Sequence, residues 1–276
     1  MGTHPSVMAR TKRDPPTLTA LGRDLISLTS CQRCRAVLLP FLSVAACVLF
    51  AANGWWLPAV LSVAAYTFSS YGSTSHDLVH GNLGLPHRLN DILLTLVELL
   101  GLRSGHAYRA AHLHHHARFP HPDDLEGAAA HGSWWAALLT APAHQLRLWW
   151  WASRYAKHDR AWIVFEGIAC GALFVSAILV WPWSPAPAVY VALVIAGSWT
   201  FPLITSYFPH DPKGEDEFAQ TRRFRGKVFA VVFGQHLYHL EHHLYPRVPR
   251  QKWPELAKRL DPYLDAAGVK PVCFGF

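Results

Sequence analysis

Residues 161–208 read AWIVFEGIACGALFVSAILVWPWSPAPAVYVALVIAGSWTFPLITSYF. The stretch consists of two apolar runs, residues 161–183 and residues 188–208, arranged around a turn that holds three prolines. Each run is close to the length of about 20 apolar residues that a helix needs to cross the hydrocarbon core of a bilayer. The stretch therefore predicts a helical hairpin that crosses a membrane and returns.

A second pair of apolar runs lies nearer the N-terminus. Residues 36–52 and residues 55–71 are separated only by Asn53 and Gly54, so they predict another hairpin of two spanning helices. Only 16% of the residues are charged, which is well below the about 25% of an average soluble domain. Twelve tryptophans also fit a chain whose indole rings lie at membrane interfaces.

The 25 lysines and arginines avoid both hairpins. None lies within residues 36–75, and Lys213 is the only one within residues 161–221. Cytosolic loops of membrane proteins carry an excess of Lys and Arg, so the three basic segments are expected in the cytosol and both hairpin turns outside. A net charge of +7 placed in this way favours anionic lipid over nucleic acid as the counterpart.

The segment between the hairpins contains shorter apolar runs. Residues 92–102 are too short to span a bilayer, whereas residues 134–151 combine five tryptophans with Arg147, which is typical of a helix that lies along the interface. We therefore predict an all-α membrane protein with four transmembrane helices in two hairpins, interfacial helices and a cytosolic helical cap.

The whole chain, residues 1–276, is expected to form one membrane-embedded domain. It is predicted to be a multi-pass protein of a bacterial inner membrane, with both termini and the active site in the cytosol. In chain order the predicted parts are a cytosolic N-terminal segment (1–35), hairpin 1 (36–72), a cytosolic and interfacial segment (73–160), hairpin 2 (161–208) and a cytosolic C-terminal segment (209–276).

Histidine is unusually frequent, with 18 residues, as many as aspartate and glutamate together. Eight of the histidines form three clusters in which members are three or four residues apart, so that their rings share one face of a helix. The charge distribution places all three clusters on the cytosolic side. The members are His76 and His80, then His112, His115 and His116, and finally His239, His242 and His243.

The clustered imidazoles indicate a metal site. Burying many imidazoles together costs desolvation and, on protonation, like-charge repulsion, and bound cations compensate for both. Eight nitrogen ligands exceed what one ion accepts, so the pattern predicts a di-metal site. Imidazole suits iron, copper and zinc alike, so the ligand type leaves the metal open.

Other polar residues near the clusters are candidates for supporting roles. His210 lies where the last apolar run ends, at the depth of the first cluster, and is a candidate ninth ligand. His236 is expected to contact a ligand, His114 is expected to point away from the ligand face, and His106 is left open. The carboxylates expected to orient the ring N–H groups of the ligands are Asp77, Asp123, Asp124 and Glu241.

Three motifs resemble the histidine boxes of the membrane fatty acid desaturase superfamily. They are H-D-x-x-H-G at residues 76–81, H-x-x-H-H at residues 112–116 followed by P-D-D, and H-L-E-H-H-L-Y-P-R-V-P at residues 239–249. The resemblance covers most of the chain. It implies two iron ions, O2 as co-substrate, an external electron donor, and a four-helix stem under a cytosolic cap.

Finer details resemble bacterial carotenoid ketolases and hydroxylases. These are Y-F-P-H at residues 207–210, P-D-D at residues 122–124 and the compact length. The second box departs from the pattern, because it reads H-L-H-H-H and because F-P-H precedes P-D-D. The shared details imply carotenoid ring hydroxylation or ketolation as the favoured activity. Because of the departures, desaturation of acyl lipids stays open as the alternative.

Electrons are expected from another protein, because no G-x-G-x-x-G follows a predicted strand and the sequence has no haem or flavin motif. A ferredoxin-type donor is expected. The basic C-terminal residues are candidates for docking it, or for contacting anionic headgroups instead. They include Arg222, Arg223, Arg225, Lys227, Arg247, Arg250 and Lys252.

Two other classes of protein are weaker interpretations. A membrane zinc hydrolase needs a positioned carboxylate base and an open metal site, and zinc without iron in the protein would support it. A transporter would carry ionisable residues within its spans, where Glu166 is the only one.

Overall fold

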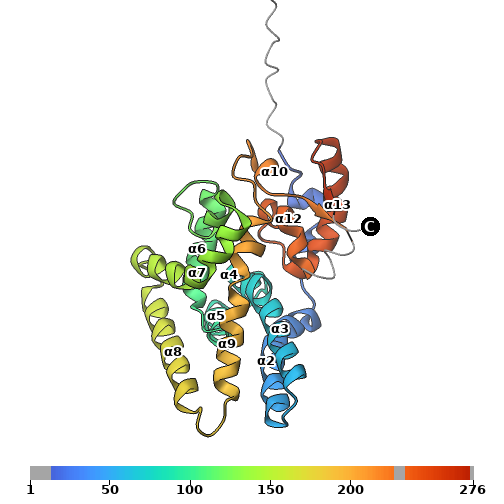
Figure 1. Cartoon of the computed structure of the whole chain (residues 1–276). Coiled ribbons are helices and arrows are strands. Elements are labelled where there is room, and N and C mark those ends of the chain that lie inside the picture. Colours follow the sequence, from blue (N-terminus) through green and yellow to red (C-terminus); the bar gives the residue numbers. More distant parts are fainter. Residues whose placement is uncertain (1–13, 227–233, 274–276) are drawn as a thin grey trace, which may run out of the picture.

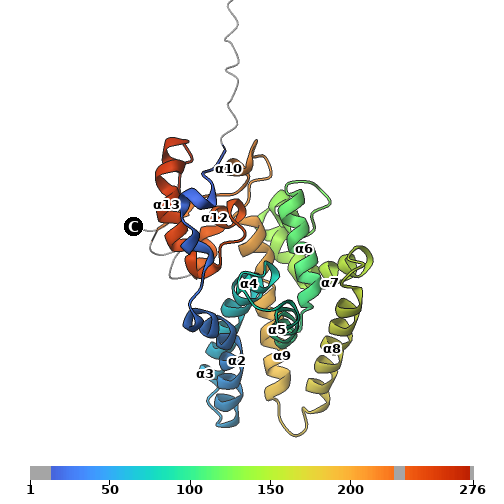
Figure 2. The same ribbon diagram turned by 180° about the vertical axis from the view of Figure 1, so that it is seen from behind.

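The computed structural model describes residues 14–226 and 234–273. The regular structure in these residues is helical apart from one parallel pair of two-residue strands, β1 (Phe224–Arg225) and β2 (Val272–Cys273). Figures 1 and 2 show a stem of long helices with a cap of shorter helices over one end of it. The predicted all-α class is confirmed.

The stem consists of two helix pairs whose connecting turns lie at the same end of the molecule, away from the cap (Figure 1). Apolar residues dominate all four helices, because their side chains face each other or the surroundings of the stem. The helices are α2 (Ser30–Ala52), α3 (Trp56–Ser69), α8 (Arg160–Leu179) and α9 (Ala186–Ser198).

Three helical stretches in the described part of the chain are long and apolar enough to cross a bilayer. Helix α3 is not among them, because it contains only 14 residues. The structure therefore gives three candidate membrane spans where the sequence predicts four. They are Arg23–Ala52, Arg160–Leu179 and Ala186–Tyr207.

Helix α3 ends where the backbone leaves helical geometry at Tyr71 (φ −60°, ψ 138°) and Gly72 (φ 62°). Glycine tolerates this positive φ. It also makes room for a neighbouring ring, because a Cβ on Gly72 would lie 2.0 Å from the ring of His236. The break redirects the chain into α4 (Ser75–Val79), which carries His76 of the first histidine cluster and is capped at its C-terminal end by His80.

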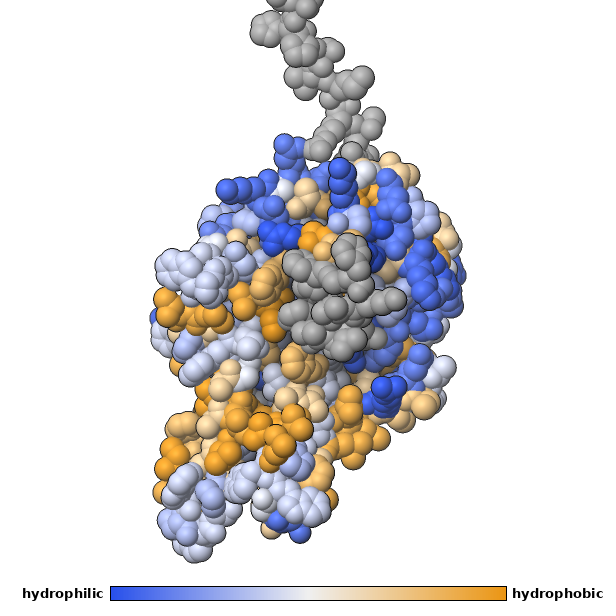
Figure 3. All heavy atoms as spheres, turned by 45° about the vertical axis from the view of Figure 1, so that its right-hand side comes forward, coloured by the Kyte–Doolittle hydropathy of each residue, from blue (hydrophilic) through white to orange (hydrophobic). Residues whose placement is uncertain are grey.

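The surface of the stem differs from that of the cap. Figure 3 shows apolar residues gathered on the stem and hydrophilic residues on the cap. Large side chains of the stem are widely exposed, including Leu57 (72%) and Ile168 (69%). Extended apolar surface of this kind marks contact with a membrane or a partner, and moving one such side chain out of water stabilises by about 1.5–3 kcal/mol. The protein is therefore an integral membrane protein.

The segment between the two helix pairs forms α5 (His87–Leu100), α6 (Gly105–Arg118) and α7 (Trp134–Tyr155). Ser104 is the N-cap of α6: its hydroxyl accepts a hydrogen bond from the N–H of Ala107 at the start of the helix that carries the second histidine cluster.

The core of the cap lies between α12 (His239–Leu244) and α13 (Trp253–Ala266). Leu240 of α12 and Leu256 of α13 are fully buried there. The remaining short elements are α1 (Leu18–Leu21), η1 (Arg23–Ile26), the π-helical break η2 (Ser70–Thr74), η3 (Gly127–His131), the π-helical η4 (Pro202–Tyr207), α10 (Glu217–Gln220), η5 (Gly234–Tyr238) and η6 (Arg250–Lys252).

Candidate metal centre

The three histidine clusters lie on α4 and its C-cap, on α6 and on α12, which meet between the stem and the cap. The nine histidines predicted as ligands form two groups, and in each group one ligand atom per residue lies within 4.8 Å of the others. Both groups mix residues from different clusters, so neither is complete until the helices pack together. The five-histidine group contains His76, His80, His112, His116 and His242, and the four-histidine group contains His115, His210, His239 and His243.

Ring nitrogens within each group approach one another closely. In the five-histidine group, His242 Nε2 lies 2.9 Å from His76 Nε2 and 2.7 Å from His116 Nε2. In the four-histidine group, His210 Nε2 lies 3.1 Å from His243 Nε2. Two nitrogens bound at right angles, each about 2.1 Å from one ion, would be about 3.0 Å apart. The donor set therefore fits one metal ion in each group.

Most of the clustered imidazoles favour the neutral form, whereas, despite burial, the hydrogen bond to Asp124 raises the pKa of His115. Burial, and then the charges of neighbouring imidazoles, keep the pKa of His76, His242 and His243 well below its usual value. Burial also lowers the pKa of His80 and of His112 to about 3. Metal ions bind the neutral ring, so these residues need to lose no proton before they bind a metal near neutral pH.

Two buried carboxylates contact ligand rings at Nδ1, on the edge away from the clustered Nε2 atoms. An Asp124 oxygen lies 2.6 Å from His115 Nδ1, and a Glu126 oxygen lies 3.0 Å from His112 Nδ1. A carboxylate that accepts from Nδ1–H leaves Nε2 free to bind metal and fixes the ring orientation. The sequence predicts Asp124 but misses Glu126, whose only signal is its place two residues after the P-D-D run.

Two other predicted carboxylates are turned toward the cap. Asp77 accepts a hydrogen bond from the backbone N–H of Arg250 at 2.9 Å, and Glu241 forms an ion pair with Arg225. Burial raises the pKa of Asp77 to about 6. These contacts fasten α4 and α12 to neighbouring segments, whereas the sequence predicts contacts to the ligand rings.

The remaining predicted residues lie at the margin of the centre. Asp123 is half exposed and pairs with Arg118 and His121 at the surface, away from the clustered rings. His236 lies against Gly72 and lines a void of about 20 Å³, which is room for about one water molecule. The void borders both groups through His76, His112, His115 and His239.

His106 and His114 lie outside both groups. His106 Nδ1 pairs with the buried carboxylate of Glu166 at 2.7 Å, which links α6 to α8. The ring of His114 contacts Trp151 at 4.9 Å between centroids.

Several of the basic residues expected to dock a partner are engaged within the protein. Arg223 pairs with Asp261 at 2.8 Å and with Asp265 at 2.6 Å, and Arg225 pairs with Glu241 and Asp261. Their charges are therefore balanced locally, whereas the sequence treats them as free cations. Lys227 lies outside the described residues.

Comparison with models of protein families matches residues 53–274, well over half of the chain, to the family described as Fatty acid desaturase. The chain belongs to the fatty acid desaturase family. This membership makes it a non-haem di-iron enzyme of the histidine-box type that acts on a lipidic substrate in a membrane. The two histidine groups fit the di-metal site typical of a fatty acid desaturase family member. A search of curated protein sequences finds no match.

Proposed function

We propose that the protein is an O2-dependent oxidoreductase in which two iron ions act together on a lipid. The observation that carries the proposal is the pairing of the five-histidine group with the four-histidine group beside an apolar stem. When bound, the irons would supply the activation of O2 that removes hydrogen from an unactivated C–H bond. The described residues supply ligand geometry and exclude water.

Each histidine group would hold one iron, with His210 as the ninth ligand. Asp124 and Glu126 would keep the His115 and His112 rings in place through their Nδ1 atoms, and outer contacts of this kind typically raise metal affinity about 10–100-fold. Asp77, Glu241 and His236 would act one step further out, by fixing the segments that carry the ligands.

We also propose that the stem crosses the membrane four times, as two hairpins of one domain. Helix α3 supplies 14 residues, which is about 21 Å of the about 30 Å hydrocarbon core. The residues of η2, which follow α3 directly, would supply the remaining length of the crossing. The distribution of Lys and Arg supports a cytosolic position for the cap, the centre and both termini, in a bacterial inner membrane.

Two lipid classes are candidates for the substrate. Carotenoid ring hydroxylation or ketolation is favoured by Y-F-P-H at residues 207–210, whose His210 belongs to the four-histidine group, and by P-D-D at residues 122–124, whose Asp124 contacts His115. Acyl-lipid desaturation is favoured by the description of the matching family.

A ferredoxin-type protein would deliver the electrons. Trp253 begins α13, and its ring lies 5.2 Å from the ring of His242 and 5.4 Å from that of His76. A donor that docks on the cap near Lys252 and the start of α13 would therefore be close to the five-histidine group.

The test is expression of the chain in a bacterium engineered to make β-carotene, with pigments and acyl chains from the same cells analysed by mass spectrometry. New ring-oxygenated carotenoids that vanish in a His239→Ala variant support the carotenoid assignment. Unchanged pigments with new double bonds in the acyl chains make the protein an acyl-lipid desaturase. No change in either class contradicts lipid oxidation by this centre in that host.

A further inference from the structure

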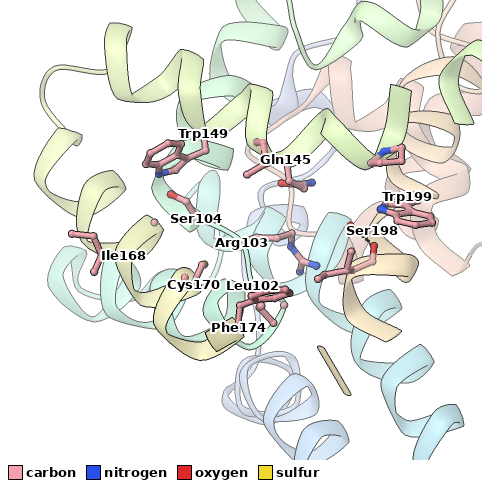
Figure 4. Close-up of a pocket in the computed structure, with 16 residues that line it drawn as sticks. Leu102, Arg103, Ser104, Gln145, Trp149, Ile168, Cys170, Phe174, Ser198 and Trp199 are labelled. Carbon is pink, nitrogen blue, oxygen red and sulfur yellow. Dashed lines mark hydrogen bonds between the residues drawn. The ribbon is translucent and has the colours of Figure 1, made fainter. Parts of the chain in front are cut away.

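A separate cavity of about 620 Å³ lies between α7 and the stem helices α8 and α9 (Figure 4). Its volume falls within the about 300–1,000 Å³ typical of sites for small molecules. Apolar side chains such as Trp149 and Phe174 make most of its wall. Two other lining residues, Leu146 (70%) and Ile168 (69%), are largely exposed, so the mouth of the cavity opens on the apolar surface of the protein.

Two N–H donors in this wall lack acceptors. Arg103 Nη1 and Gln145 Nε2 are buried, and neither makes a hydrogen bond of normal length to the described residues, although the Tyr71 hydroxyl, which also lacks one, lies near Gln145. Figure 4 shows Gln145 reaching from α7, and Arg103 from the segment after α5, toward the same space. Because a buried donor without an acceptor costs free energy, the pair points to a ligand that brings an acceptor oxygen.

The charge of Arg103 is already balanced. Its Nε lies 2.7 Å from Glu98 Oε2 and its Nη2 lies 3.1 Å from Glu98 Oε1, and both side chains are buried. A ligand carboxylate would therefore add a buried charge with no counterpart. Gly101 leaves space for this ion pair, since a Cβ there would lie 2.6 Å from the guanidinium. The acceptor that fits is a neutral carbonyl or hydroxyl oxygen.

A stack of rings connects this cavity with the metal centre. The Arg103 guanidinium lies 5.4 Å from the centre of the Tyr71 ring, which stacks on Tyr108 at 4.4 Å between centroids. Tyr108 in turn contacts the ring of His112 at 5.5 Å. One pair of tyrosine rings therefore lies between the two donors and the five-histidine group.

We infer that the cavity binds one lipid, whose apolar part lies along the wall and whose neutral oxygen accepts hydrogen bonds from Arg103 and Gln145. That this lipid is the substrate rests on the proposed function. The substrate class then narrows to lipids that carry a carbonyl or hydroxyl oxygen along an otherwise apolar skeleton, so that a carotenoid already oxygenated on one ring, or an acyl lipid, fits the cavity better than β-carotene, which has no oxygen.

The test uses Cys170, which lines the cavity, as a reporter. The full-length protein in detergent is treated with N-ethylmaleimide in the presence of hexadecane or 8-hexadecanone, which differ by one carbonyl oxygen, and alkylation of Cys170 is measured by peptide mass spectrometry. The ketone is expected to protect Cys170 at about tenfold lower concentration than the hydrocarbon, as one or two gained hydrogen bonds predict. In Gln145→Leu, which removes one donor without stranding a charge, the preference should fall to about threefold.

Thr140→Val is the matched control on α7, because the Thr140 hydroxyl donates to the carbonyl of Ala136 in its own helix. It should leave the tenfold preference intact. Equal protection by the two probes, or protection by neither, overturns the inference. Phosphatidylcholine that protects as well as the ketone would make the cavity a site for bilayer lipid and overturn the substrate assignment. Because alkylation requires no turnover, failure of the proposed oxidation would leave these results unchanged.

Discussion

The two histidine groups lie side by side but are built differently. In the five-histidine group, Glu126 contacts His112, while the Nδ1 atoms of His76 and His242 have no hydrogen-bond partner among the described residues. This group therefore gathers many ring nitrogens with little support from behind the rings.

The four-histidine group has fewer rings, and they are held more firmly. His115 Nδ1 contacts Asp124 at 2.6 Å, and His210 Nδ1 donates to the backbone carbonyl of Ser206 at 2.9 Å. Ligand number and ligand support therefore offset each other between the two groups. An ion in the four-histidine group would also keep more positions for other molecules, because fewer are filled by protein nitrogens.

The largest expected effect comes from removing one ring from the four-histidine group, and removing one ring from the five-histidine group is the comparison. His243→Ala leaves three ligands in the four-histidine group, so the variant should bind about one iron per chain and lose turnover by at least about 100-fold, the scale of losing one preorganised electrostatic group from an active site. His80→Ala leaves four ligands in its group and should retain both irons. Iron analysis of the two purified variants, together with product formation, makes the comparison. Equal iron loss in both would contradict the difference between the groups.

The helical spacing of the histidines could be predicted from the sequence because it is local. The division into groups could not, since His242 and His243 are neighbours in the chain yet belong to different groups. Successive residues of a helix point about 100° apart, so one turn of α12 serves both groups, and only the packing of α4 and α6 decides which ring joins which.

Other features divide in the same way into those that depend on local sequence and those that depend on distant contacts. The two apolar pairs stand out from composition alone, whereas the end of α3 depends on the contact between Gly72 and His236, which are far apart in the sequence. Glu126 and Arg103 carry no motif, and their roles arise from partners that the fold brings to them.

The next effect concerns the supporting carboxylate of the four-histidine group. Asp124→Asn should weaken iron binding toward the upper end of the about 10–100-fold typical of such outer contacts. The Asp124 contact with His115 is shorter than the Glu126 contact with His112, and the group that contains His115 has only three other rings. Competition with a chelator measures the change. Unaltered affinity would show that His115 needs no carboxylate to hold its orientation.

Glu126→Gln should have a smaller effect, toward the lower end of about 10–100-fold. Its contact with His112 is longer, at 3.0 Å, and four other rings remain in that group. Asp123→Asn is the matched control at the surface and should stay within about twofold of the unmodified protein. A larger loss for Glu126→Gln than for Asp124→Asn would reverse the proposed order of support.

A core substitution should lower stability without favouring either group. Leu240 is fully buried on α12, which carries rings of both groups, so Leu240→Ala should cost about 2–5 kcal/mol of unfolding free energy. Thermal unfolding monitors the stability, and iron analysis should give the same fractional occupancy in both groups. Leu57→Ala on the exposed face of α3 is the control and should hardly change the unfolding temperature. Selective loss of one iron in Leu240→Ala would show that α12 supports the groups unequally.

The decisive measurement for the two-ion centre is the metal content of the purified, unmodified protein, determined by mass spectrometry of the elements after production in iron-replete medium. Two irons per chain are predicted, one for each histidine group. One iron per chain, or zinc in place of iron, would contradict the account of two adjacent histidine groups that hold a di-iron centre.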